Sequence, residues 1–141
     1  MVNSLMTAQT TVDPSEIAKF EAMAAEWWDP NGKFKPLHLM NPCRLDYITR
    51  QIAHEYDRDL GQANPFSGLR ILDIGCGGGV LAEEFARLKC QVTGIDISVE
   101  SLDVARAHAK TEGLSINYQL GSATELQYDE SSFDVVSCCD V

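Results

Sequence analysis

The chain has 141 residues, room for one domain with a single hydrophobic core, since domains usually run to roughly 100–200 residues. Its 45% hydrophobic and 23% charged residues are typical of a globular rather than a disordered protein. The net charge of −10 argues against nucleic acid as a partner, because phosphate binding requires clustered Lys and Arg. Five cysteines without metal-ligand spacing favour reduced thiols and a cytoplasmic location.

The N-terminal part predicts a helical cap over 13–60, preceded by a disordered tail at 1–12 that has no features of a signal peptide. Residues 13–16, Asp-Pro-Ser-Glu, are typical of a helix start, with the aspartate as N-cap and proline in the first turn. Turn residues at 29–32 end this helix. The pair Asn-Pro at 41–42 predicts the start of a second helix after a connector.

After a linker at 61–68, the pattern changes to apolar segments that alternate with helical ones. Strands are expected at 69–74, 91–95, 115–120 and 133–138, and helices at 80–88 and 98–111. Alternation of this kind indicates parallel βαβ units. We therefore predict an α/β fold, a Rossmann-like three-layer sandwich, with 69–141 as its first part.

A glycine-rich loop lies between the first predicted strand and the helix after it. Residues 71–79 read Ile-Leu-Asp-Ile-Gly-Cys-Gly-Gly-Gly, and four glycines in five positions favour a ligand that approaches the backbone. The alternative is a tight strand–helix turn without a ligand. Asp96 ends the second predicted strand, where a carboxylate can accept both hydroxyls of a ribose. We expect an adenosine-containing cofactor to contact Gly75, Gly77 and Asp96.

The spacing of the glycines distinguishes between adenosine cofactors. A dinucleotide site would require a third glycine at position 80, which is Val80, and Asp73 before the loop is unusual for such a site. The pattern Asp-x-Gly-x-Gly-x-Gly instead resembles the signature of class I S-adenosylmethionine-dependent methyltransferases. That resemblance implies S-adenosyl-L-methionine as the cofactor and adds Asp73 to its binding residues. A non-catalytic module that binds NAD or another nucleotide remains the alternative.

The segments before the loop give a narrower resemblance. Residues 13–20, 27–29, 32–38 and 41–48 resemble the opening of the bacterial ubiquinone biosynthesis O-methyltransferases, and 133–136 continue the match. The resemblance implies methylation of a phenolic hydroxyl on polyprenylated catechol or demethylubiquinol intermediates. It also implies a sheet of which this chain holds about four of the family's seven strands, so we expect the isolated chain to be inactive.

Carried over residue by residue, the resemblance implies cofactor contacts at Arg44, Gly75, Asp96 and Cys139. Arg44, in the first turn of the predicted second helix, would pair with the cofactor carboxylate, and a solvated helix residue is the alternative. In related members an acid at position 140 begins a magnesium-binding segment. We expect no metal site here, with Asp140 as a weak candidate, and leave Mg²⁺ open for the full-length enzyme. The catalytic residues are unknown and expected after Val141.

The partner implied by the resemblance is a polyprenylated phenol or quinol, and another phenol or a lipid is the alternative substrate. Peripheral association with the inner membrane or with a ubiquinone-synthesis complex is left open. Two adjacent tryptophans, Trp27 and Trp28, end the first predicted helix. Because Trp27 falls on the apolar stripe, we expect it to pack in the core, and part of a lid over the quinol is the alternative.

Overall fold

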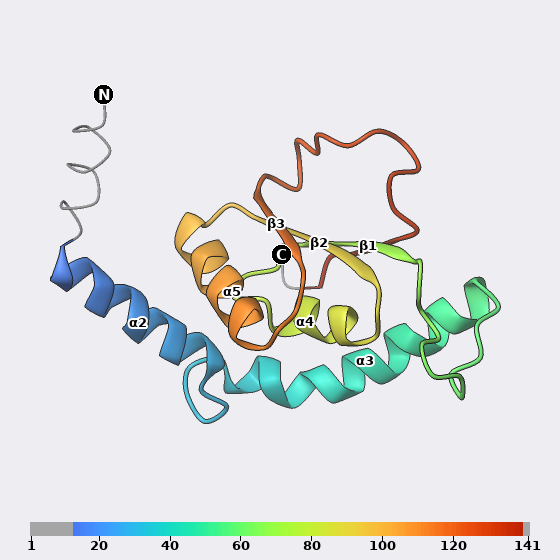
Figure 1. Cartoon of the computed structure of the whole chain (residues 1–141), viewed down its shortest axis with the longest axis horizontal. Helices are drawn as coiled ribbons and strands as arrows, with labels where there is room; N and C mark the ends of the chain where they lie inside the picture. The colour runs from blue at the N-terminus through green and yellow to red at the C-terminus, as the bar shows by residue number, and fades with distance from the viewer. Residues whose placement is uncertain (1–12, 140–141) are drawn as a thin grey trace.

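The computed structural model describes residues 13–139. At its centre lies a parallel sheet of four strands in the order β3-β2-β1-β4 (Figure 1). The strands are β1 (Arg70–Ile74), β2 (Gln91–Asp96), β3 (Asn117–Leu120) and β4 (Val135–Ser137). Helices α4 (Val80–Arg87) and α5 (Val99–Thr111) connect β1 to β2 and β2 to β3. The predicted Rossmann-like α/β class, as an incomplete sheet, is confirmed.

Strand β1 lies between two neighbours and is buried along nearly its whole length, as expected of an apolar strand in a parallel sheet. It pairs with β2 in a register that sets Ile71 opposite Val92 and Ile74 opposite Ile95. The residues that directly follow the two strands therefore meet at one edge of the sheet. This register brings the glycine-rich loop beside Asp96.

Two long helices, α2 (Pro14–Trp28) and α3 (Lys35–Glu55), precede the sheet and lie along the outer side of α4 and α5 (Figure 1). Helix α2 contacts α5, and α3 contacts α4. The predicted start of α2 is confirmed, since the Asp13 side chain accepts a hydrogen bond from the Ser15 backbone N–H at 2.9 Å. No helix within 13–139 is long and apolar enough to cross a membrane.

The predicted start of the second helix at 41–42 is wrong. Helix α3 begins at Lys35, with Pro36 in its first turn, and it includes Pro42 in its interior. Asn41 is buried, and its Nδ2 donates to the carbonyl of Val80 at 3.0 Å. An Asn-Pro pair is a local start signal, but here a tertiary hydrogen bond to α4 takes the asparagine side chain and the helix continues through the proline.

The segment at 61–68, expected as a linker, has no helix or strand but is attached to the core. Phe66 within it is fully buried in the main hydrophobic cluster, which also includes residues from β1, β2, α3, α4 and α5. The Arg58 guanidinium donates to the backbone carbonyls of Pro65 and Ser67 at 3.1 and 3.0 Å. The segment therefore contributes to the stability of the fold rather than only spanning a distance.

Strand β4 lies at one edge of the described sheet and pairs with β1. Its position is set by Asp134, whose carboxylate accepts the Arg70 backbone N–H at 2.8 Å and the guanidinium at 3.1 Å. These hydrogen bonds lower the pKa of Asp134. The Tyr56 hydroxyl, at the end of α3, also donates to the Asp134 carbonyl. Strand β4 is thus connected through Asp134 to β1 in the sheet and to the end of α3.

Candidate cofactor-binding site

Two cavities open at the carboxyl ends of β1 and β2, and both are lined by Gly75 and Asp96. The first, of about 540 Å³, extends from the glycine-rich loop to the turn between α2 and α3. The second, of about 430 Å³, extends past Ile97 to the loop after β3, at 121–124. In open α/β sheets ligands bind outside the carboxyl ends of the strands. An elongated ligand could therefore occupy both cavities and pass over the residues that they share.

Asp96 holds a fixed position between the two cavities. One carboxylate oxygen accepts the Gly77 backbone N–H at 2.9 Å, and the other accepts the Ser98 backbone N–H at 2.9 Å. Each oxygen keeps further acceptor capacity, since an ionised carboxylate offers about four lone-pair sites. The side chain is half-buried and lines both cavities. Asp96 can thus still accept two hydroxyls of a ribose while the loop holds it in place.

The loop itself takes backbone conformations that favour glycine. Gly75, Gly77 and Gly79 have positive φ angles of 71°, 54° and 91°. The backbone N–H of Gly75 donates to the Ile95 carbonyl at 2.8 Å, which ties the loop to the end of β2. The expected strand–loop–helix context of the motif is therefore present.

Side chains of the protein itself leave no room for a Cβ at three of the loop glycines. A Cβ added at Gly77 would lie 2.5 Å from Trp27 Cη2, and one at Gly78 would lie 2.6 Å from Trp27 Cδ2. At Gly79 the neighbour is the Tyr118 hydroxyl, also at 2.5 Å. The expectation that a ligand explains these glycines is thus too simple, because Trp27 and Tyr118 already occupy the space beside three of them.

Trp27 lies on the glycine-rich loop rather than in the core of the sheet, so its predicted core position is wrong. The indole is half-buried and stacks on Phe34 with ring centroids 3.8 Å apart and an interplanar angle of 5°. Both rings line the first cavity, together with Lys33. The Lys33 ammonium lies 5.5 Å from the Phe34 ring centroid. The sequence pattern could not distinguish these positions because loop and helix are far apart along the chain.

Cys76 lines the first cavity but is not suited to act as a nucleophile. Its side chain is 7% exposed, and burial, with Asp73 and Asp96 nearby, raises the pKa of its thiol far above the usual range. The thiol therefore stays protonated at neutral pH, and thiolate chemistry requires the deprotonated form. A covalent intermediate at this position is not supported.

Of the residues predicted to bind the cofactor, the structure brings Gly75, Gly77 and Asp96 together at the cavities. Within residues 13–139, Arg44, Asp73 and Cys139 do not line either cavity. Their cofactor contacts stay predictions, and Asp140 lies outside the described residues.

The surroundings of these three residues are nevertheless defined. Arg44 lies well inside α3, not in its first turn, and its Nη2 donates to Asn41 Oδ1 at 2.6 Å. Asp73 is buried and accepts the Ser137 hydroxyl at 2.8 Å, which links β1 to β4. Cys139 is exposed and lies two residues after the end of β4. Arg44 and Asp73 thus have structural contacts that the sequence did not indicate.

The second cavity is lined by residues outside the glycine motif that the sequence pattern did not indicate. Ile97 directly follows β2, and Gly121, Ser122 and Thr124 follow β3. Their signal in the sequence was their place immediately after predicted strands, because parallel strands end at the same edge of the sheet. Ile97 is 77% exposed, so an apolar side chain faces the open part of this cavity.

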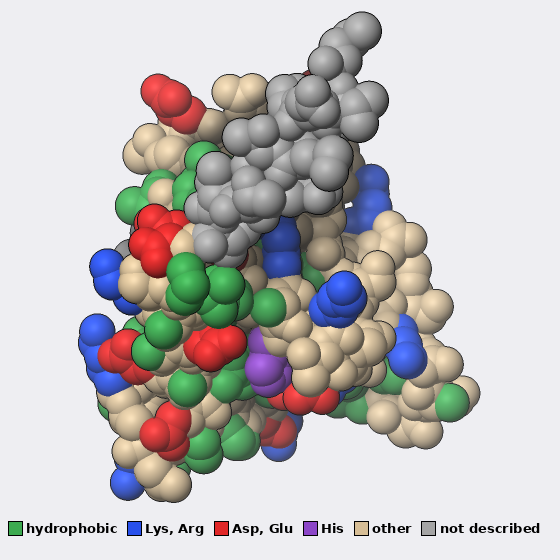
Figure 2. All heavy atoms as spheres, turned by 60° about the vertical axis from the view of Figure 1, so that its left-hand side comes forward, with side chains coloured by type: hydrophobic (Ala, Val, Ile, Leu, Met, Phe, Trp, Pro, Cys, Tyr) green, Lys and Arg blue, Asp and Glu red, His purple; other side chains and the backbone are tan. Residues whose placement is uncertain are grey.

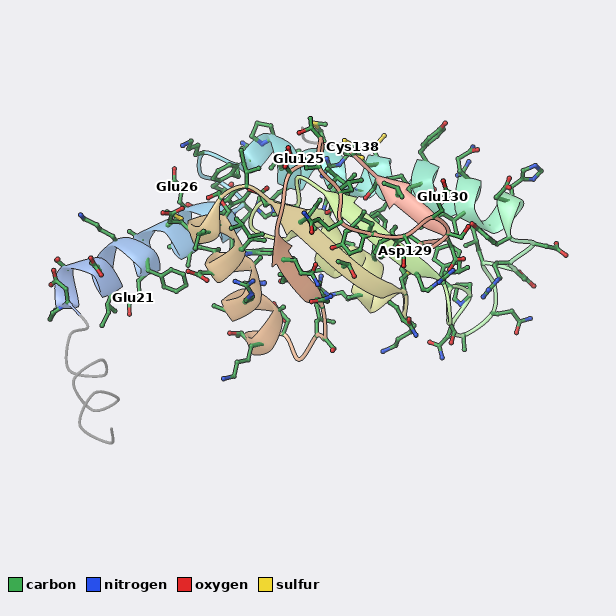
Figure 3. All side chains as sticks on the ribbon, turned by 90° about the horizontal axis from the view of Figure 1, so that it is seen from above. Glu21, Glu26, Glu125, Asp129, Glu130 and Cys138 are labelled. Carbon is green, nitrogen blue, oxygen red and sulfur yellow. The ribbon has the colours of Figure 1, made fainter. Side chains whose placement is uncertain are left out.

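The described residues do not provide a metal site. No group of three or more His, Cys, Asp or Glu side chains within 13–139 could hold a metal ion. Figure 3 shows Glu21, on α2, and Asp129 and Glu130, in the loop before β4, on opposite sides of the molecule. The face with α2 and α5 carries acidic and hydrophobic side chains interspersed, without a continuous patch of Lys and Arg (Figure 2).

Two curated proteins similar to this chain carry the same name. A protein named ubiquinone biosynthesis O-methyltransferase, from Roseobacter denitrificans, is 64% identical over 132 residues, which are 94% of this chain and 53% of that protein. One of the same name from Ruegeria pomeroyi is 66% identical over 126 residues, 89% of this chain and 51% of that protein. The chain thus spans about half the length of the curated relatives it matches.

Solved structures agree on the fold. The PH0226 protein from Pyrococcus horikoshii is 20% identical with a TM-score of 0.55, over 79% of this chain and 46% of that chain. The cyclase SpnF is 32% identical with a TM-score of 0.50, over 64% of this chain and 32% of that chain. A family model described as a methyltransferase domain matches residues 71–141, half of the chain, which include the loop, Asp96 and the whole sheet from the second residue of β1. The chain therefore belongs to the methyltransferase-domain family.

Proposed function

We propose that the whole protein is an S-adenosylmethionine-dependent O-methyltransferase of ubiquinone biosynthesis, acting on a phenolic hydroxyl of a polyprenylated catechol or demethylubiquinol. The relatives' names and the 64% and 66% identities support the pathway. The main observation in support of a cofactor site is the position of Asp96. Its carboxylate is held by two backbone N–H groups between two adjoining cavities. A carboxylate held in this way is suited to the two hydroxyls of a ribose, and Val80 in place of a third fingerprint glycine favours S-adenosylmethionine over a dinucleotide.

When bound, S-adenosylmethionine would supply a methyl group on a sulfonium, whose sulfur–methyl bond would break as the phenol oxygen bonds to the methyl, so that S-adenosylhomocysteine leaves. The residues of this chain would bind and orient. Asp96 would accept the ribose hydroxyls, Gly75 would allow the ligand to approach the loop backbone, and Gly77 would hold Asp96 through its backbone N–H. Alignment of two reactants removes a large part of the barrier to a displacement, on the order of 7–11 kcal/mol in favourable cases.

Three further cofactor-binding residues belong to the proposal. Arg44 would pair with the cofactor carboxylate from α3, Asp73 would act through the shape of the loop that follows it, and Cys139 would border the ligand after β4. The group that accepts the phenol proton is proposed to lie in the sequence after Val141, where Mg²⁺ binding would also be sought.

The organisation and location of the whole protein complete the proposal. We propose a helical cap over 13–60 and a cofactor-binding α/β layer that begins at 69, in a cytoplasmic enzyme. A polyprenylated substrate resides in a membrane, so peripheral association with the inner membrane, or with other enzymes of the pathway, would give access to it.

The test is cofactor binding and methyl transfer by the whole protein carrying Asp96→Asn. Asparagine keeps one acceptor but lacks the charge, and hydrogen bonds to charged groups contribute about 1.5–3 kcal/mol. We therefore expect S-adenosylhomocysteine to bind roughly 10- to 100-fold more weakly by calorimetry. The matched control is Asp103→Asn, an exposed residue of α5 that pairs with Arg106 at 3.2 Å and should leave affinity unchanged. Equal affinity of the Asp96 variant and wild type would refute the assigned role.

Two alternatives are separated by further measurements. Tight binding of NAD without binding of S-adenosylhomocysteine would replace the methyltransferase proposal with a nucleotide-binding module. For the substrate, deletion of the gene should cause a demethylated ubiquinone precursor to accumulate. Normal ubiquinone levels in the deletion strain, with methyl transfer to another phenol or lipid in vitro, would retain the enzyme class and reject the pathway.

A further inference from the structure

The carboxyl-terminal end of α2 presents two aromatic side chains in two directions. Consecutive side chains of a helix point about 100° apart, so the rings of Trp27 and Trp28 pack against different parts of the molecule. Trp27 lies on the glycine-rich loop. Trp28 instead stacks on the imidazole of His108, on α5, with ring centroids 3.5 Å apart and an interplanar angle of 4°. One helix end therefore contacts both the loop and the second crossover helix.

The imidazole of His108, on which Trp28 stacks, is also in contact with the buried carboxylate of Glu83. His108 Nδ1 lies 2.6 Å from Glu83 Oε2, and Glu83, on α4, is 0% exposed. The other Glu83 oxygen accepts from Arg87 at 3.1 Å. On the outer side, His108 Nε2 lies 3.6 Å from Glu112. A ring with partners at both nitrogens cannot turn freely, so the surface on which Trp28 stacks is fixed in orientation.

Helix α2 packs against α5 through side chains that are at most half-buried. None of its residues is buried, so it has no fully enclosed side chain to anchor it. At its end, His38 Nε2 lies 2.9 Å from the Trp27 carbonyl, and the His38 ring meets Trp28 edge-on at 5.8 Å. A helix held in this way by its surface should shift when a parallel ring stack is lost.

We propose that His108, oriented by Glu83, is a positioning residue for the cofactor site, because its stack with Trp28 fixes the end of α2 and thereby sets Trp27 against the glycine-rich loop. His108 does not line either cavity and acts through α2. The inference rests on the proposed function, since the site it positions is the proposed S-adenosylmethionine site. It assigns a part in cofactor affinity to four residues outside the glycine motif, Trp27, Trp28, Glu83 and His108.

The test uses the whole protein and calorimetry with S-adenosylhomocysteine. His108→Ala removes the surface under Trp28, and Trp28→Leu removes the stack from the other side without altering α5. Each should weaken binding by roughly 2- to 10-fold, the range that the loss of one ring stack supports, while Trp28→Phe, which keeps an aromatic ring on His108, should retain most of the affinity. His54→Ala, at an exposed histidine of α3, is the matched control and should bind as wild type does.

A double-mutant cycle separates positioning from a loss of stability. Trp27→Leu removes the side chain through which His108 is proposed to act, so adding His108→Ala to it should change affinity by less than two-fold. A loss in the double variant, relative to Trp27→Leu, that is as large as the loss caused by His108→Ala alone would overturn the proposal. Wild-type affinity in both His108→Ala and Trp28→Leu would overturn it as well. Should the wild type itself fail to bind S-adenosylhomocysteine, the proposed function falls instead, so the two failures are distinguishable.

Discussion

Substituting Gly78 by alanine should destabilise the protein through a steric conflict with Trp27. The added Cβ would lie 2.6 Å from Trp27 Cδ2 and 2.7 Å from Cγ, closer than the 3.0 Å that real Cβ atoms keep. The indole cannot simply withdraw, because Phe34 stacks on it at 3.8 Å. Overpacking of this kind costs typically about 1–3 kcal/mol. Since Gly78 is not among the glycines with positive φ, backbone strain contributes little.

The assay is chemical denaturation of the whole protein, followed for Gly78→Ala, Trp27→Leu and the double variant. If Trp27 causes the conflict, removing its ring should make the alanine nearly neutral, so the double variant should be about 1–3 kcal/mol more stable than the sum of the single effects predicts. Gly68→Ala provides the control for backbone strain, because Gly68 has a φ of 86° and nothing within 4 Å of an added Cβ. Additive effects of Gly78→Ala and Trp27→Leu would refute the reasoning.

Two further predictions concern titration and reactivity. Asp134→Asn should lower the stability of the fold at pH 7. Hydrogen bonds from Arg70 lower the folded-state pKa of Asp134, so the stability that the carboxylate contributes is lost as the pH falls through that pKa, and the difference between variant and wild type should vanish there. A difference in stability that is independent of pH between 7 and 2 would contradict this. Iodoacetamide at pH 8 should label the exposed Cys138 well before the buried Cys90, whose pKa burial raises to about 11, and equal rates by peptide mass spectrometry would contradict it.

The fold alone does not decide the reaction. The structural neighbours include SpnF, which is named a cyclase, at a TM-score of 0.50 and 32% identity. Unrelated reactions occur on one fold because function depends on the residues of the site. For this chain the site is defined by Asp96, the glycine-rich loop and the aromatic wall of Trp27 and Phe34. The variants at Asp96 and His108 therefore test the function more directly than further structural comparison.

The sequence alone determined those features that depend on neighbours in the chain. The aspartate cap at residue 13, the end of α2 before the turn at 29–32, and the strand–loop–helix position of the glycine motif are all confirmed. Caps, turns and apolar periodicity act over a few residues, so the amino acids that produce them are adjacent. Parallel strands and the edge at which Asp96 meets the loop followed from that alternation, because chirality and short connections leave few other topologies.

Only the tertiary structure decided which side chains meet across long separations. Helix α3 runs through the Asn-Pro pair because Asn41 bonds to Val80, 39 residues away, and the expected linker contains a core residue, Phe66. Trp27 was assigned to the core because its spacing fits an apolar stripe, yet its neighbours are the loop and Phe34. Periodicity identifies the face of a helix that is covered, and the covering partner depends on how distant elements pack, which no local pattern encodes.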